Sequence, residues 1–267
     1  MRCAIIQYFV DPFLYERPRF NRLATIQPLA ELSKRSFETY CDKHGIDFIR
    51  ITRPKLKYRH PTYERFDLWM DGKWWEKYDQ ICYVDSDVFA LPHAPNIFEN
   101  YQDLNTFKYC RHELYRDLKI KDIKKKFRKT LLSSCNPKDI RDKFFQTGVF
   151  ILTKKSAEHM KPWTKLYNKL DHDDAEILNW ATMKSNVPVT EMNELYNYKN
   201  AWQIGKPSVY FLHCYGHKKK KQMNIIQQVV SLYYGLIERK LLHITLTRYI
   251  HDQTIGVRVS FLNGAGL

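Results

Sequence analysis

The 267-residue sequence lacks several features that would assign it to other classes of protein. It has no uninterrupted apolar run of the roughly eighteen residues that a membrane-spanning helix needs. The apolar run at its start, residues 1–9, is also too short for a secretory signal peptide. We therefore expect a cytoplasmic protein without a membrane-spanning segment, which could still lie on a membrane surface.

Cysteine pairs with metal-binding or redox spacing are also missing. The six cysteines are scattered, and several lie in apolar runs, where a buried thiol behaves as a small hydrophobic side chain. We expect free thiols. Glycine is scarce, with nine residues in the chain, and residues 7–21 contain none. A nucleotidyltransferase normally carries a glycine-rich phosphate loop after its first strand, so the sequence disfavours that class.

Acidic residues are outnumbered by basic ones. The chain has 44 lysine and arginine residues against 29 aspartate and glutamate residues, which gives a formal net charge of +15. Such a charge indicates an anionic partner, either a nucleotide diphosphate, a nucleic acid or a lipid headgroup, and does not choose among them. The 44% apolar and 15% aromatic content argues against a disordered chain and allows a large buried core.

Helical and strand-like segments alternate along most of the chain. Residues 28–43 carry apolar residues at helical spacing, end at Gly45, and lead into the strand-like residues 47–51. A candidate helix at 63–75 precedes the apolar run 81–84, which we predict to be a buried strand. Further strands are predicted at 149–152 and 209–212, and further helices at 157–170 and 174–184. This alternation favours the α/β class.

Residues 111–143 differ in composition from the rest of the chain. Between positions 119 and 129 lysines and one arginine are interleaved with Ile123, Phe127 and, further on, Leu131, at four-residue spacing. This pattern predicts a basic amphipathic helix. Two interpretations stay open, namely a solvated face on a helix packed against the core, and contact with an anionic membrane surface or an acceptor.

Two carboxylates, Asp85 and Asp87, stand two residues apart directly after the predicted strand 81–84. An extended backbone points both side chains to the same side, and two anions that close need a cation. Oxygen ligands suit a hard divalent ion such as Mg²⁺ or Mn²⁺, with open positions for the phosphates of a nucleotide. The strand end is also where open α/β sheets bind ligands, although the pair alone also fits a surface turn or a helix cap.

Residues 81–88 resemble the strand and DxD motif of glycosyltransferases with the GT-A fold, especially the group of glycogenin and the lipopolysaccharide galactosyltransferases. Residues 145–152 are similar to that group's Asn-Ser/Thr-Gly-Val strand. Residues 174–179 resemble its Asp-Gln-Asp-x-Leu-Asn helix start. Residues 213–218 look like its His-x-x-Gly-x-Lys segment. The order and spacing of these matches carry the resemblance, because no single match is decisive.

Three shorter segments support the same resemblance. Residues 63–66 resemble the segment whose arginine contacts the nucleotide, and residues 195–198 resemble a Leu-Pro-x-x-Tyr-Asn loop without its proline. Residues 40–47 are similar to a Tyr-x-x-x-His-Gly-Tyr-Asp run of fungal and plant galactosyl- and xylosyltransferases. The resemblance implies a GT-A catalytic domain over residues 1–221, with a mixed, mainly parallel sheet flanked by helices. A mainly helical extension is expected over residues 222–267.

The resemblance implies a metal-dependent enzyme that moves a sugar from a nucleotide sugar, with a UDP-sugar expected, to a glycan or other hydroxyl acceptor. In relatives the histidine at the place of His213 is a third metal ligand, which implies the set Asp85, Asp87 and His213 for Mn²⁺ or Mg²⁺. A neutral imidazole can complete a sphere begun by two carboxylates. The donor-binding residues implied by the resemblance are Tyr8, Arg65, Asp85, Ser86, Gly216 and Lys218.

The candidate catalytic residues are Asp174 and Asp173, either as a base for the acceptor hydroxyl or as a stabiliser behind the sugar. Aspartates at a helix start are also favoured as caps, so a structural role is open for both. Gln146 stands where the family usually has Asn, and Ala175 stands where it has Gln. These departures leave open whether the sugar's configuration is retained or inverted.

Two functions other than catalysis stay open at this point. A basic nucleic-acid-binding module would account for the charge, but not for the carboxylate pair, and we expect no nucleic-acid partner. A GT-A protein that binds a glycan without catalysis is the milder alternative. The sequence allows peripheral contact with an anionic membrane and does not predict an oligomeric state.

Overall fold

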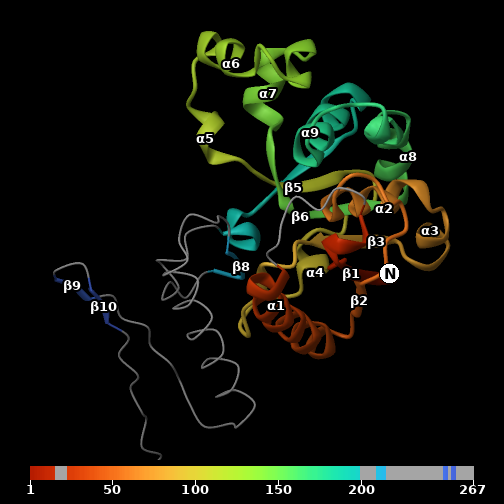
Figure 1. Ribbon diagram of the computed structural model, residues 1–267, viewed down its shortest axis with the longest axis vertical. Coiled ribbons are helices and arrows are strands. Elements are labelled where there is room, and N and C mark those ends of the chain that lie inside the picture. Colours follow the sequence, from red (N-terminus) through yellow and green to blue (C-terminus); the bar gives the residue numbers. More distant parts are fainter. Residues whose placement is uncertain (16–22, 199–208, 215–248, 252–253, 257–267) are drawn as a thin grey trace, which may run out of the picture.

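The structure is a computed structural model, described here for residues 1–15, 23–198, 209–214, 249–251 and 254–256. Its centre is a six-stranded sheet with the order β2-β1-β3-β6-β5-β7 (Figure 1). The pairings of β1 with β2, of β1 with β3 and of β5 with β7 are parallel, and β6 runs antiparallel to both of its neighbours. The predicted mixed, mainly parallel sheet is confirmed. The strands are β1 (Cys3–Tyr8), β2 (Asp47–Ile51), β3 (Gln80–Val84), β5 (Phe107–Arg111), β6 (Phe145–Thr153) and β7 (Val189–Met192).

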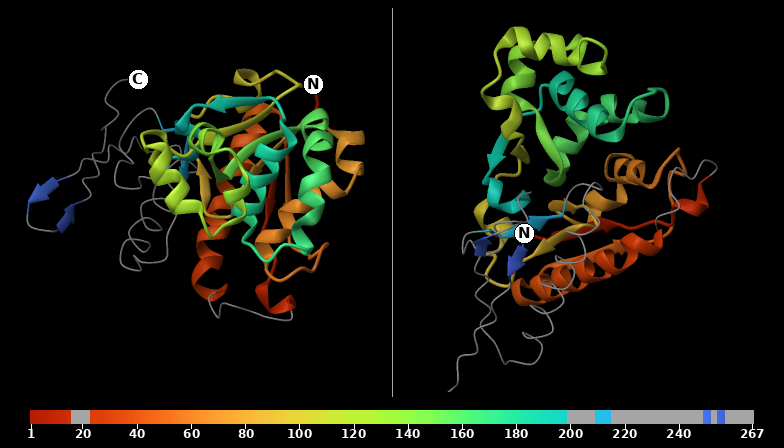
Figure 2. Two further views of the ribbon diagram at one scale, coloured as in Figure 1. Left: turned by 90° about the horizontal axis from the view of Figure 1, so that it is seen from above. Right: turned by 60° about the vertical axis from the view of Figure 1, so that its left-hand side comes forward.

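Helices cover both faces of this sheet, which is why its central strands are almost wholly apolar. In β3, Ile81 and Tyr83 pack into a core on one face, while Cys82 and Val84 pack into a core on the other. The first core contains residues of α8 and α9, and the second contains residues of α1. Figure 2 (right) shows α1 below the sheet and the other two helices above it. These helices are α1 (Leu23–His44), α8 (Lys154–Thr164) and α9 (Asp174–Ser185).

The turn after α1 follows the sequence prediction. Gly45 adopts φ +64°, a left-handed conformation that other residues rarely take, and so ends the helix. The Ile46 amide donates to the Cys41 carbonyl at 3.0 Å. The chain then enters β2 directly.

The single helix predicted at residues 63–75 is wrong, because the segment is broken into three pieces. The interruption falls at Asp71-Gly72, where Asp71 has extended backbone torsions and its side chain accepts from the Lys73 amide at 3.0 Å. This turn starts a new helix in a new direction. The pieces are η2 (Pro61–Phe66, a 3-10 helix), α2 (Asp67–Met70) and α3 (Lys73–Lys77).

Between β5 and β6 the chain leaves the sheet and builds a helical lobe, defined here as residues 112–144 (Figure 1). Its apolar side chains, among them Ile123 and Phe127, pack against Trp180 and Met183 of α9. The Leu131 amide also donates to the Glu176 carboxylate. The lobe therefore rests on the helix whose first residue is a candidate catalytic aspartate. Its elements are α5 (Glu113–Arg116), α6 (Ile120–Phe127), η3 (Leu131–Ser134) and α7 (Pro137–Lys143).

A second, two-stranded sheet joins distant parts of the chain. β4 (Val88–Ala90) pairs antiparallel with β8 (Phe211–His213), and Val88 lies opposite His213. The Cys214 amide donates to the Asp87 carbonyl at 2.9 Å. This pairing brings the predicted histidine ligand beside the Asp-x-Asp segment. The remaining elements are η1 (Pro12–Leu14), α4 (Ile97–Asn100), η4 (Lys165–Asn168), η5 (Glu194–Asn197), β9 (Tyr249–His251) and β10 (Thr254–Gly256).

All six cysteines are free, as predicted. Among the described residues, no helix combines the length and the apolar character that crossing a bilayer requires. The predicted domain boundary between positions 221 and 222 lies outside the described residues. Within the predicted extension, the structure describes the antiparallel strands β9 and β10.

Candidate active site

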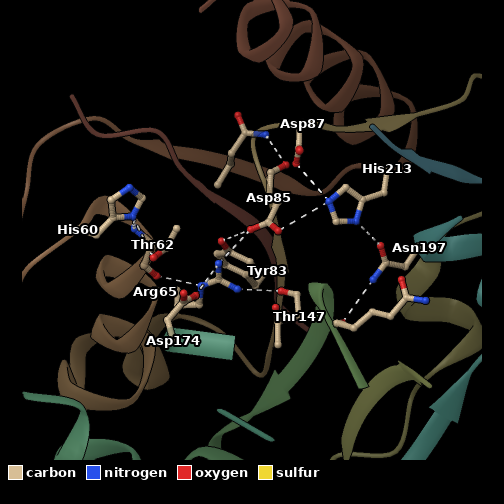
Figure 3. A network of polar contacts seen from close by, with 12 residues as sticks. His60, Thr62, Arg65, Tyr83, Asp85, Asp87, Thr147, Asp174, Asn197 and His213 are labelled. Carbon is tan, nitrogen blue, oxygen red and sulfur yellow. Dashed lines mark hydrogen bonds and ion pairs between the residues drawn. The ribbon is translucent and has the colours of Figure 1, made fainter. Parts of the chain in front are cut away.

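The two predicted metal-binding aspartates lie in a tight turn between β3 and β4. The Asp85 amide donates to the Gly148 carbonyl of β6 at 2.8 Å, and the Val88 amide donates to the Asp85 carbonyl at 3.1 Å. The Gln7 side-chain amide donates to the same carbonyl at 3.3 Å. The backbone of the turn is therefore fixed by both neighbouring strands, and its two carboxylates lie on the side of His213 (Figure 3).

The structure brings together the three side chains predicted as metal ligands. His213 Nε2 lies 3.3 Å from Asp87 Oδ1 and 3.9 Å from Asp85 Oδ2. One potential ligand atom from each residue lies within 4.8 Å of the other two. His213 is buried, and Asp85 and Asp87 are partly buried. Two carboxylate oxygens and one imidazole nitrogen form a donor set that suits Mn²⁺ or Mg²⁺ in chemistry and in charge.

Asn197 determines which nitrogen of His213 faces the carboxylates. Its side-chain amide donates to the Gln146 backbone carbonyl at 3.3 Å, so its Oδ1 is the atom that lies 2.8 Å from His213 Nδ1. Because that oxygen only accepts, Nδ1 carries a hydrogen, and in the neutral imidazole the Nε2 lone pair faces Asp85 and Asp87. The sequence matched residues 195–198 to a family loop, but we assigned Asn197 no role.

Gly148 is a second residue whose importance the sequence did not reveal. A Cβ atom at this position would lie 2.3 Å from His213 Cε1, 2.6 Å from His213 Nδ1 and 3.1 Å from Asp85 Oδ2. Contacts this short would displace the imidazole. The glycine is therefore needed for the histidine to approach the carboxylates, and its place in the family-like strand 145–152 was the available clue.

Arg65 lies on the opposite side of Asp85 from His213 (Figure 3). Its Nη2 is 3.3 Å from Asp85 Oδ1 and 2.9 Å from Asp174 Oδ2, and its Nη1 donates to the Thr147 carbonyl at 2.9 Å. Burial opposes the charge of Arg65, but the carboxylates, Asp174 foremost, raise the pKa of its guanidinium above the ordinary value. Arg65 thus links a candidate metal ligand to a candidate catalytic residue.

The charge on Asp85 is disfavoured without a metal ion. Burial raises the pKa of Asp85, Arg65 opposes that rise, and the carboxylate of Asp87 adds to it, leaving the pKa above its ordinary value. The Tyr83 hydroxyl donates to Asp85 Oδ1 at 2.5 Å. A divalent cation would favour the ionised form of both aspartates, so the electrostatics of the cluster also fit a metal ion.

The two predicted catalytic aspartates occupy different environments. Asp173 is exposed and caps α9, because its Oδ1 accepts from the Glu176 amide at 2.7 Å. Asp174 begins the helix and forms the ion pair with Arg65. Arg65 therefore contacts both Asp174 and the candidate metal ligand Asp85. Asp173 has the structural role, a helix cap, that was left open.

The structure describes some of the predicted donor-binding residues but not all of them. The Tyr8 hydroxyl donates to the Asp67 carboxylate at 3.0 Å, and the residue is 7% exposed. Ser86 lies between the two aspartates in the turn and is partly exposed. Gly216 and Lys218 lie outside the described residues.

Comparisons with known proteins give a fold and no sequence family. No family model matches the chain, and no curated protein matches it. A glycosyltransferase involved in the glycosylation of the major capsid of PBCV-1 matches with a TM-score of 0.55 and 14% identity, over 85% of this chain and 100% of its own. The bifunctional glycosyltransferase WbbM matches with a TM-score of 0.53 and 12% identity, over 89% of this chain and 51% of its own. The galactosyltransferase LgtC matches with a TM-score of 0.44 and 15% identity, over 85% of this chain and 95% of its own.

At these identities the first two matches establish the architecture, which agrees with the predicted sheet and helices. The chain has the GT-A glycosyltransferase fold, with two candidate metal ligands directly after strand β3 and the third, His213, at the end of β8.

Proposed function

We propose that this protein transfers a sugar from a nucleotide sugar, with UDP as the expected nucleotide, to a hydroxyl group of a glycan or other acceptor. The observation that carries the proposal is the meeting of Asp85, Asp87 and His213, whose ligand atoms lie within 4.8 Å of one another in a GT-A fold. Asp85 and Asp87 follow the buried strand β3, which runs parallel to β1, and the ends of such strands are where open α/β sheets bind ligands. The matches to family motifs at four places in the chain support the same proposal.

In this proposal Asp85, Asp87 and His213 hold Mn²⁺ or Mg²⁺, and Asn197 keeps the Nε2 lone pair of the histidine available. When bound, the cation would neutralise the negative charge that develops on the departing nucleoside diphosphate. Arg65 holds the carboxylate of Asp85 in place from the other side.

The remaining donor contacts rest on the resemblance. We assign Tyr8, Arg65 and Ser86 to donor binding, together with Gly216 and Lys218, which would approach the diphosphate. A glycine permits close approach of its backbone, and a lysine supplies positive charge to the leaving group. The Tyr8 hydroxyl is bonded to Asp67, so we expect its ring, rather than its hydroxyl, to contact the donor.

Asp174 is the proposed catalytic carboxylate, with Asp173 as the second candidate. The ion pair with Arg65 fixes the direction of the Asp174 carboxylate. An oriented carboxylate at this place could accept the proton of an acceptor hydroxyl or stabilise positive charge on the sugar. Because the Asp173 side chain is engaged as a helix cap, Asp174→Asn should reduce turnover far more than Asp173→Asn.

The test is release of UDP from a panel of UDP-sugars, with Mn²⁺, with Mg²⁺ and with a chelator. We expect metal-dependent release by the wild type and by Asp42→Asn, a control at an exposed position of α1, and strongly reduced release by Asp87→Asn. Release that persists in chelator would contradict the proposal. Glycan binding without release from any donor, by folded and metal-loaded protein, would instead support a GT-A protein without catalysis.

A further inference from the structure

The helical lobe carries a strongly basic surface that the proposed sugar transfer does not use. In residues 116–129 eight basic residues stand against Asp117 and Asp122, and all ten of these side chains are exposed. This short segment therefore holds +6 of the net charge of +15. The basic residues are Arg116, Lys119, Lys121, Lys124, Lys125, Lys126, Arg128 and Lys129.

The apolar face of α6 is already used inside the protein. Ile123 is fully buried and Phe127 is 7% exposed, and both pack with Trp180 and Met183 of α9. Four of the six exposed residues of the helix are lysines, and the other two are Ile120 and Asp122. The helix therefore cannot insert its apolar face into another structure, and any partner must meet the lysines and arginines at the surface.

The charges of this segment are not compensated by the described part of the chain. None of the eight basic side chains forms an ion pair with a described residue. The ammonium of Lys126 lies 5.3 Å from the centre of the Tyr115 ring, its one aromatic contact. Elsewhere, partly exposed lysines such as Lys34 and Lys143 pair with a carboxylate one helical turn away. Clustered like charges oppose folding, so a partner outside the chain is the physical reason to keep them.

The composition and place of the segment identify the chemistry of that partner. Six of the eight residues are lysines, which act as mobile point charges, whereas recognition of a single phosphate or carboxylate favours the fork of arginine. The aromatic residue within the segment, Phe127, is buried, so it offers no ring on which nucleic-acid bases could stack. Figure 1 shows α6 at the outer end of the lobe, away from the sheet. A diffuse basic array on a projecting helix matches a broad anionic surface.

We propose that residues 116–129 form an electrostatic docking surface for a bilayer that contains anionic lipids. Clusters of four to eight lysines and arginines on a helix are typical of such contacts. Exposed Ile120, 36% accessible among the lysines, could add a small apolar contact at the headgroups. Because the lobe rests on α9, docking would fix the orientation of the Asp174 edge relative to the lipid surface. This proposal does not depend on catalysis.

The experiment is co-flotation with lipid vesicles, with neutral phosphatidylcholine alone or with phosphatidylcholine plus phosphatidylglycerol, at about 50 mM and about 500 mM salt. We expect binding to the anionic vesicles at low salt, and loss of binding at high salt or without the anionic lipid. Each lysine near the surface should contribute roughly a factor of five to the partition coefficient. Neutralising four lysines of the segment should therefore reduce it by roughly two orders of magnitude or more. The variant carries Lys121→Gln, Lys124→Gln, Lys125→Gln and Lys129→Gln.

A matched control variant carries the same change in charge on another helical surface, in α8 and the residues that follow it. Its binding should fall by less than a few-fold, which separates a local surface from the effect of net charge. Glutamine keeps a high helix propensity, so both variants should fold, which circular dichroism and unchanged UDP release from a soluble donor would verify. The control carries Lys154→Gln, Lys161→Gln, Lys165→Gln and Lys169→Gln, four exposed positions.

Three outcomes would overturn the proposal. These are no binding to anionic vesicles at low salt, equal binding to neutral vesicles, and equal losses in the two variants. A separate measurement, fluorescence anisotropy with a labelled RNA in the low-salt buffer, tests the nucleic-acid alternative. If the lobe variant loses RNA binding but keeps vesicle binding, the segment is a nucleic-acid surface and the lipid proposal is wrong. If it loses vesicle binding and the control keeps it, the proposal stands.

Discussion

Two acidic clusters in this molecule, one fully and one partly buried, have different sets of partners. Around Glu64, which is fully buried, the carboxylate accepts from the Tyr15 hydroxyl at 2.6 Å and from the backbone amides of Lys55, Leu56 and Lys57 at 2.7 to 2.9 Å. Every one of these partners is supplied by the chain. The cluster is complete within the protein, and its role is to fix the loop that follows β2.

Around Asp85 and Asp87 the chain supplies less. Tyr83 and Arg65 contact Asp85 Oδ1, but Asp85 Oδ2 and Asp87 Oδ1 face His213 Nε2. With Asn197 accepting from Nδ1, Nε2 is the ring nitrogen that faces the two carboxylates. The comparison separates the two clusters by their donors: the chain supplies four donors to Glu64, whereas Asp85 and Asp87 fit a cation from outside the chain.

The largest effect is expected from a substitution in the second cluster, that of Asp85 and Asp87. Asp87→Asn should lower metal-dependent UDP release by about 10²- to 10³-fold, because the charge that stabilises the leaving group is no longer held correctly. Without metal its thermal midpoint should be unchanged or higher than that of the wild type, because a like charge beside Asp85 is removed. Enzyme assays and thermal melts in chelator measure the two effects. A large loss of stability in chelator would mean that this cluster is structural after all.

The next largest effect is expected from a substitution in the first cluster, that of Glu64. Glu64→Gln should reduce the free energy of unfolding by about 3 kcal/mol, because an amide cannot accept from all of the donors that converge on the buried carboxylate. Denaturant unfolding, with Glu99→Gln at an exposed position as control, measures the loss. The affinity of the folded fraction for Mn²⁺ should stay within a few-fold of the wild type. A selective loss of metal binding with normal stability would contradict the separation of the two clusters.

A smaller effect tests the orientation of His213. Asn197→Ala should weaken Mn²⁺ binding by about 10- to 100-fold, because the imidazole loses the acceptor that fixes its tautomer. Asn197→Asp keeps an acceptor for Nδ1 and should recover part of that affinity. Calorimetry, or the electron paramagnetic resonance signal of free Mn²⁺, measures binding without reference to turnover. Equal affinities for the alanine variant and the wild type would remove Asn197 from the site.

Sequence reasoning predicted the parts of the site that depend on local pattern. Asp85 and Asp87 follow an apolar strand, and such a strand end can be recognised without any tertiary information. His213 was found through a family resemblance. Its approach to the carboxylates depends on the pairing of β4 with β8, which cannot be predicted from the local sequence.

The parts that were missed depend on contacts between distant segments. Gly148 matters because of the imidazole above it, and Asn197 matters because its amide is fixed by the carbonyl of Gln146. The helix predicted at 63–75 was broken by the Asp71-Gly72 turn, which a pattern of apolar residues does not reveal. The sheet order and the support of the lobe by α9 likewise follow from long-range packing.

The smallest expected effect concerns the pH dependence of stability that a buried lysine, Lys108, causes. It extends the comparison from buried carboxylates to a buried positive charge. Lys108 is fully buried, and its ammonium donates to the backbone carbonyls of Asp103 and Thr106. Burial lowers the pKa of Lys108 from 10.5 to about 8, so the folded state holds this proton less tightly than the unfolded state does. The cost of charging Lys108 is therefore present in full below about pH 8 and is relieved as the pH rises toward 10.5.

The stability of the wild type should accordingly rise, relative to that of Lys108→Met, by at most about 1.4 kcal/mol per pH unit above pH 8. Denaturant unfolding of both proteins between about pH 7 and pH 9.5 measures this difference, and the upper limit keeps the tyrosines protonated. A difference that is flat across this range would show that the two carbonyls hold the ammonium as well as water does. The hydrogen bonds of Lys108 would then offset the burial of its charge, as those of Glu64 do, and Lys108 would not destabilise the folded state.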